Sequence, residues 1–91
     1  MKARYVRCST DAQNPARQLQ KSHPDELLFI DFISGAVSLD KRSEGLKMLQ
    51  AIESGQVDFL TIESIDRLGR STTDVINRLQ YFQDKGVTVR V

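Results

Sequence analysis

Cysteine occurs only once in this 91-residue sequence, at Cys8, which excludes an intramolecular disulfide. Tryptophan is absent and proline occurs twice. No apolar run approaches the length of a membrane span, and the first residues lack the apolar stretch of a secretory signal. These absences point away from secreted and membrane proteins, so we expect a cytoplasmic location.

An excess of charge of one sign is also lacking. The 13 Lys and Arg residues are nearly balanced by 12 Asp and Glu residues, which gives a formal net charge of +1. A free-standing DNA-binding domain is usually far more basic. Either the chain does not bind nucleic acid, or its basic residues are concentrated in one place, or its main DNA-binding part lies elsewhere.

What the sequence does contain is typical of one small globular domain. Hydrophobic residues make up 40% and charged residues 27%. Strands are predicted over residues 2–8, 27–32, 58–64 and 87–91, and helices over 15–22, 43–54 and from 72 or 73 to 85. This alternation predicts an α/β domain over residues 1–91 with a mainly parallel sheet.

Several local features can be predicted as well. Asn14 is expected to cap the first helix, and Thr72 or Thr73 the third. The apolar second strand is expected to be buried. Gly55 and Gly86 are expected to end the second and third helices. The predicted inward stripes of these two helices are Leu46, Leu49 and Ile52, and Val75, Ile76, Leu79 and Phe82.

Arg7 and Ser9 stand at the end of the first strand, where open parallel sheets carry their functional sites. They are two residues apart, so both side chains lie on one face of an extended strand. A guanidinium beside a hydroxyl suits attack on a phosphate, because the cation stabilises charge on the phosphoryl oxygens. The alternative is that Ser9 or Thr10 only caps the next helix, since Thr10 and Gln13 have capping-box spacing.

A second polar group follows the third strand. Arg67 and Arg70 are three residues apart, so they share a face of a helical turn. Two planar groups that are always charged suit the binding of a phosphodiester. Asp66 could orient an arginine or relay a proton. The alternative is a solvated charge cluster with an internal ion pair.

Other polar residues are weaker candidates. Arg42 could fold over the site or be an exposed arginine at a helix start. Gln13 and Gln18 could position a phosphate, although surface glutamines are common. Asp31 ends the second strand, and a functional or a structural role fits it. Cys8 is interpreted as a small buried apolar residue. The sequence has no metal-ligand cluster and no Walker loop, so no metal and no cofactor is expected.

Three segments resemble the serine recombinases, the resolvase and invertase family. Residues 5–13 (YVRCSTDAQ), followed by Gln18, are similar to the opening motif of the family. Residues 34–42 are similar to its mobile loop and the arginine that follows. Residues 65–71 (IDRLGRS) are similar to its most diagnostic segment. The resemblance covers residues 4–91, in the family's order and with nearly its spacings.

The resemblance implies a DNA strand transferase that cuts and rejoins DNA at specific sites, as a resolvase, an invertase or a transposon recombinase. Ser9 would attack the scissile phosphodiester, giving a 5′-phosphoseryl link and a free 3′-hydroxyl. This link would conserve bond energy, so neither ATP nor metal would be needed. The residues carried over are Arg7, Arg42, Arg67 and Arg70 as DNA-binding and catalytic phosphate ligands, Asp66 as a catalytic assistant, and Gln13, Gln18 and Asp31 as supporting residues.

The resemblance also implies architecture and partners. The fold would be a three-layer α/β resolvase-like catalytic domain with helices on both faces of a four-stranded, mostly parallel sheet in the order 2-1-3-4. The partners would be double-stranded DNA at a specific recombination site and further copies of the protein, in a homodimer and a synaptic tetramer, with no membrane. A dimerisation helix and a DNA-binding domain would follow these 91 residues, so we expect a truncated domain that is inactive alone.

Some features depart from the family, and two other classes of protein remain open. The family often has a lysine in the helix after Arg42, but the nearest aligned positions hold Ala51 and Ile52. Lys47 is the nearest lysine in that helix, and the role stays unassigned. A phosphatase or nuclease on a similar sheet would need a metal cage or a Cys-x5-Arg loop. A non-catalytic remnant of a recombinase is the other alternative.

Overall fold

The computed structural model describes residues 1–9 and 14–91. In this part of the chain, four parallel strands form one sheet in the order β2-β1-β3-β4. The strands are β1 (Lys2–Cys8), β2 (Glu26–Phe32), β3 (Phe59–Ile62) and β4 (Thr88–Arg90), and the helices are α1 (Ala16–Ser22), α2 (Ser43–Glu53) and α3 (Thr72–Asp84). Two 3₁₀ turns, η2 (Leu39–Lys41) and η3 (Ile65–Leu68), precede α2 and α3. The predicted α/β fold and strand order are confirmed.

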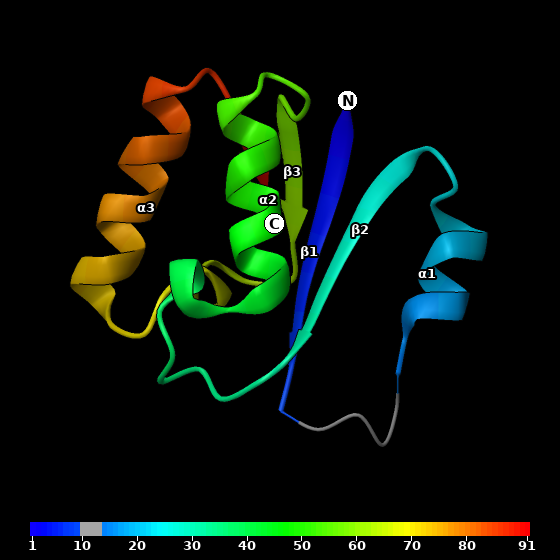
Figure 1. The fold of residues 1–91 in the computed structure, drawn as a ribbon, viewed down its shortest axis with the longest axis horizontal. Helices are drawn as coiled ribbons and strands as arrows, with labels where there is room; N and C mark the ends of the chain where they lie inside the picture. The colour runs from blue at the N-terminus through cyan, green and yellow to red at the C-terminus, as the bar shows by residue number, and fades with distance from the viewer. Residues whose placement is uncertain (10–13) are drawn as a thin grey trace.

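The sheet separates two helical layers, as predicted. Figure 1 shows α2 and α3 on one side of the sheet and α1 on the other. Alternate residues of β1 follow this division, because successive side chains of a strand point to opposite faces. Ala3 and Tyr5 are fully buried in the cluster that includes the α2 and α3 residues, whereas Val6 and Cys8 line a hollow together with Leu19 of α1.

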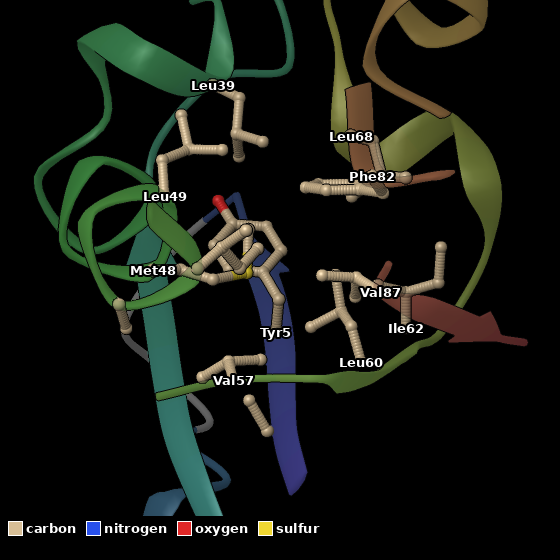
Figure 2. Packing of buried hydrophobic residues seen from close by; sticks show 13 residues of the cluster. Tyr5, Leu39, Met48, Leu49, Val57, Leu60, Ile62, Leu68, Phe82 and Val87 are labelled. Atoms are coloured by element: carbon tan, nitrogen blue, oxygen red, sulfur yellow. The ribbon is translucent and has the colours of Figure 1, made fainter. Parts of the chain in front are cut away.

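The hydrophobic core lies between the sheet and the two longer helices. Figure 2 shows the Tyr5 ring in the middle of this cluster. Burial of one such side chain contributes about 1.5–3 kcal/mol, so this layer is the main source of the domain's stability. The fully buried apolar members are Ala3, Tyr5, Leu39, Met48, Leu60, Leu68 and Phe82.

Two helix stripes differ from the prediction. Leu46 is 43% exposed and Ile76 is 60% exposed. In α2 the buried face consists of Gly45, Met48, Leu49, Ala51 and Ile52 instead, and Gly45 lies against Leu39 of η2. In α3, Ile76 faces the pocket described below rather than the core.

The helix ends also refine the prediction. Ser71 caps α3, because its Oγ accepts a hydrogen bond from the Asp74 amide (3.2 Å), so neither threonine is the cap. Pro15 is the N-cap residue of α1, one residue later than predicted, and Asn14 Oδ1 accepts from the Ala16 amide (2.9 Å). Gly55 and Gly86 follow α2 and α3 with φ of +79° and +74°, the left-handed conformation that favours glycine.

The prediction that the second strand is buried is wrong. β2 is an edge strand, and only Asp31 is buried within it. The seven-residue helix α1 covers too little of the sheet to bury the other apolar side chains of β2. β4 ends at Arg90 rather than at the last residue. No helix in the described part of the chain has the length and apolarity needed to cross a bilayer.

Candidate active site

The carboxyl ends of β1, β2 and β3 meet at one edge of the sheet, because all three strands are parallel. Arg7 pairs with Asp31 across β1 and β2, and Tyr5 pairs with Ile62 across β1 and β3. The segments that follow the three strands therefore begin beside one another. This edge is where functional sites form in open α/β sheets.

A pocket of about 440 Å³ opens at this edge. Its charged lining residues are Arg7, Asp66 and Arg70. We call this pocket the arginine pocket. Its full lining is Arg7, Gly35, Ile65, Asp66, Gly69, Arg70, Ser71, Thr72, Val75, Ile76 and Leu79.

Arg7 is half-buried at the base of this pocket. Its NH1 donates to the Ile33 carbonyl (2.9 Å), which fixes the guanidinium against the loop after β2. A Cβ at Gly35 would lie 3.4 Å from Arg7 Cζ, so the glycine lets the loop approach the guanidinium closely. The Arg7 Nε is buried and has no acceptor among the described residues. One donor of a permanent cation is therefore left for a ligand.

Arg67 and Asp66 lie together in η3. The Arg67 Nε is also buried without an acceptor in residues 1–9 and 14–91. The exposed Asp66 Oδ1 accepts a hydrogen bond from Ser64 Oγ. This hydrogen bond, and then the charges of Arg67 and Arg7, lower the pKa of Asp66 below its ordinary value of 3.8. The carboxyl of Asp66 is thus held in its ionised form at neutral pH.

The backbone around Arg70 is fixed by Asp74. Asp74 Oδ2 accepts from the Arg70 amide (2.9 Å), while the exposed Arg70 side chain lines the pocket. A Cβ at Gly69 would lie 2.7 Å from that Asp74 oxygen, so the glycine makes room for the carboxylate. The start of α3 therefore holds Arg70 at the rim of the arginine pocket.

Ser9 is exposed and follows the last residue of β1 directly. Pro15 occupies the N-cap of α1, and no described side chain caps that position, so the structure gives no support to Ser9 as its cap. Gln18 is exposed on α1 and does not line the arginine pocket. Thr10 and Gln13 lie outside the described residues. Cys8 is half-buried rather than fully buried.

Arg42 is neither an exposed helix-start arginine nor a residue of the pocket lining. It is fully buried, and its guanidinium donates to the carbonyls of Val37 (2.8 Å), Arg67 and Gly69 (3.5 Å). It also donates to the Tyr5 hydroxyl (3.2 Å). The predicted phosphate ligand is therefore separated from solvent in this structure.

Asp31 and Tyr5 complete the same buried network. Tyr5 OH donates to Asp31 Oδ2 (2.8 Å). The two Asp31 oxygens also accept from the amides of Glu44 and Gly45 (2.9 Å each), so this carboxylate caps the N-terminus of α2. Asp31 is therefore structural in this conformation. We call Tyr5, Asp31 and Arg42 the brace.

Sequence reasoning missed the role of Tyr5. Its signal was present, because Tyr5, Arg7 and Ser9 recur every second residue and so share one face of β1. A tyrosine on a buried face needs a partner for its hydroxyl. Reasoning from polar residues alone also missed the apolar wall of the arginine pocket, to which Ile65, Val75 and Leu79 contribute.

No group of three or more His, Cys, Asp or Glu side chains in residues 1–9 and 14–91 could hold a metal ion. Burial raises the pKa of Tyr5 well above its ordinary value, so its hydroxyl keeps its proton inside the brace. The polar side chains that line the pocket are those of Arg7, Asp66, Arg70, Ser71 and Thr72.

Together, the fold and the site define a parallel α/β domain with a serine and an arginine cluster at the carboxyl edge of its sheet. A family model described as "Resolvase, N terminal domain" matches residues 2–91. The chain belongs to the resolvase family, within that N-terminal domain.

Curated relatives agree with this assignment, and a solved structure shares the fold. A "Resolvase/recombinase" of Pseudomonas putida is 34% identical, with 94% of this chain and 48% of the relative covered. A "DNA-invertase" of Escherichia phage P1 is 37% identical, with 94% and 45% covered. The N-terminal catalytic domain of TP901-1 integrase has the same fold, with a TM-score of 0.75, 21% identity, and 98% of this chain and 76% of that one covered. The chain spans about half the length of the curated relatives it matches.

Proposed function

We propose that this chain is the catalytic part of a site-specific DNA recombinase and that Ser9 is its nucleophile. The Ser9 Oγ forms a bond to the scissile phosphorus, and the bond from phosphorus to the 3′ oxygen breaks. The serine gives up its proton, and the leaving 3′ oxygen takes one up. Attack of a 3′-hydroxyl on the phosphoseryl link then reverses the step, joins the new strand and restores Ser9.

The unpaired buried donors of Arg7 and Arg67 are the observation that carries this proposal. A buried polar donor without a partner costs about 1–3 kcal/mol, and more when the group is charged. These two Nε atoms have no access to solvent in this conformation, so a phosphodiester oxygen would satisfy them once the arginine side chains turn toward it, and it would neutralise their charge at the same time. Arg7 lines the arginine pocket, and Arg67 lies in η3 next to Asp66, which also lines it. Arg70 would hold a further oxygen from the rim of the pocket.

The proposed substrate is double-stranded DNA at a specific recombination site. Two duplexes that exchange both strands need a nucleophile for each cut strand, so we propose that the intact protein acts as a homodimer on each site and as a tetramer across two sites. The net charge of +1 agrees with DNA binding that depends on residues outside this chain. We therefore expect the 91-residue chain alone to be inactive.

Covalent attachment to DNA tests the nucleophile. The intact gene product that contains these residues is incubated with a duplex carrying its recombination site, and protein-linked DNA is resolved on a denaturing gel. Wild type and the control Ser22→Ala, at an exposed serine that ends α1, should form the link, and Ser9→Ala should not. Equal attachment by Ser9→Ala would refute the proposal. Cut DNA without attached protein would favour the nuclease alternative.

A further inference from the structure

We infer that Arg42 is a positioning residue, which acts on the arginine pocket through the backbone of η3 and not by binding phosphate. This inference rests on the proposed function of that pocket. Arg42 is the member of the brace whose hydrogen bonds reach Arg67 in η3 and the adjoining Gly69, which lines the pocket. No phosphate can reach its guanidinium in this conformation, because the side chain has 0% exposure.

The guanidinium of Arg42 joins three parts of the chain. Its Nε binds the Val37 carbonyl in the loop after β2, and its NH1 binds the Tyr5 hydroxyl on β1. NH1 and NH2 bind the carbonyls of Arg67 and Gly69. The planar group spans four acceptors that a single ammonium could not reach together.

Two carbonyls, one in η3 and one directly after it, link the brace to the pocket. One belongs to Arg67 itself, and the other belongs to Gly69, the residue before Arg70. Fixing these carbonyls fixes the backbone from which both arginine side chains extend. The Val37 contact holds the same loop whose Gly35 lies against the Arg7 guanidinium. Arg42 therefore sets the relative placement of three arginines without lining the pocket.

The charge of Arg42 is balanced within the brace. Tyr5 accepts from Arg42 and donates to Asp31, so the buried carboxylate meets the buried guanidinium through one hydroxyl. Asp31 is 5% exposed and is fixed in turn by the first turn of α2. Moving Arg42 toward a phosphate would leave the Tyr5 hydroxyl and three carbonyls without this donor. The network thus favours retention of Arg42 in the brace.

Amide hydrogen exchange on the intact protein tests the brace without any DNA. In Arg42→Met, the amides of Arg67 and Arg70 should exchange about tenfold faster or more, while core amides of β1 and β3 stay protected. Both amides are hydrogen-bonded here, to Ser64 O (3.1 Å) and Asp74 Oδ2. Arg78→Met is the matched control, because Arg78 is a half-buried arginine of α3 outside the pocket lining.

Unchanged exchange at Arg67 and Arg70 in Arg42→Met would overturn the inference. If Arg42→Met does not fold, Arg42→Lys replaces it, since lysine keeps the charge but cannot span the four acceptors. The same local increase in exchange is then expected, and its absence has the same consequence. This result is independent of whether Ser9 attacks DNA, so it separates failure of the brace from failure of the proposed function.

Neutralising the scissile phosphate separates positioning from direct contact. On a duplex with a methylphosphonate at that position, a variant that has lost a phosphate-binding cation should regain cleavage relative to wild type. We expect this recovery for Arg70→Ala but not for Arg42→Lys. Recovery by both variants to the same extent would show that Arg42 contacts the phosphate and would overturn the inference.

A double variant distinguishes positioning from general loss of stability. If Arg42 acts by placing Arg67, the slowing caused by Arg42→Lys should largely disappear in an Arg67→Ala background, because residues that act as a unit are not additive. Slowing by the same factor in both backgrounds would contradict the inference and indicate a merely structural residue. If wild-type protein never attaches to DNA, the proposed function is refuted. The exchange measurement would still show whether Arg42 positions the backbone at Arg67 and Arg70.

Discussion

At the residue scale, the Tyr5 hydroxyl is the point where two buried charges meet. It is fully buried, donates to Asp31 and accepts from Arg42. Its raised pKa keeps the proton that this double role requires. A phenylalanine would fill the same space in the core but would leave Asp31 and Arg42 each with one hydrogen bond fewer.

Tyr5→Phe should therefore lower the free energy of unfolding by about 1–3 kcal/mol, since buried partners lose a hydrogen bond that water cannot replace. Urea denaturation followed by circular dichroism measures this change. The matched control is Tyr81→Phe, whose hydroxyl binds the exposed Glu53, and it should change stability by about 0.5 kcal/mol or less. Equal effects at the two positions would contradict the role of Tyr5.

The sequence predicted which arginines line the pocket, but it did not predict that Arg42 is buried. Arg7 and Arg70 were predictable because Arg7 stands at the end of β1 and Arg70 belongs to the segment that follows β3, and such ends converge in parallel sheets. The burial of Arg42 was not predictable, because its acceptors are backbone carbonyls about 25 residues away, at Arg67 and Gly69. Such carbonyls leave no pattern in a sequence. Long charged side chains are almost never fully buried unless paired, so the prior favoured exposure.

At the element scale, α2 is held at its N-terminus from two sides. Asp31 caps the first turn, and Gly45 packs against η2, where a Cβ would lie 2.5 Å from the Leu39 carbonyl oxygen. The spacing of apolar residues predicted the helix, but it did not predict which side of the helix faces the core. The buried face includes Gly45, whose close approach to Leu39 leaves no apolar pattern in the sequence, while Leu46 is 43% exposed.

Gly45→Ala should lower stability, although alanine is the better helix former by about 1 kcal/mol. The contact with a backbone oxygen forces α2 away from η2, and such overpacking costs about 1–3 kcal/mol. Urea denaturation measures the net loss. Gln50→Ala, at an exposed position of the same helix, should be neutral or slightly stabilising. An increase in stability for Gly45→Ala would show that η2 moves freely and that α2 is not held in this way.

At the scale of the whole molecule, a nearly neutral chain concentrates arginines at one edge of its sheet. Elsewhere acidic and basic residues pair with one another, as Glu53 and Lys85 do (3.2 Å) just beyond the end of α3. The fold class and strand order followed from the alternation of elements and the family resemblance. The exposure of β2 did not follow from them. Local signals predicted a short helix α1, but they did not show that so short a helix leaves most of β2 unburied.

The salt dependence of DNA binding should show whether the arginines at this edge of the sheet contact phosphates. Each phosphate contact contributes about 0.9 to the slope of log affinity against log salt concentration. Arg70→Gln in the intact protein should lower the magnitude of that slope by about 0.9, while Lys85→Gln should leave it unchanged. Fluorescence anisotropy with a labelled duplex at several salt concentrations measures both. Equal changes in the two variants would mean that Arg70 contributes only to the general charge.

The central claim is that Ser9 becomes joined to DNA, and peptide mapping of the covalent adduct tests it most directly. Trypsin should release residues 8–17, which contain both Ser9 and Thr10 as hydroxyl candidates. After nuclease trimming of the DNA, fragment-ion mass spectrometry should place a 5′-linked nucleotide phosphate on Ser9. An adduct on Thr10, or on a residue outside this peptide, would contradict the account.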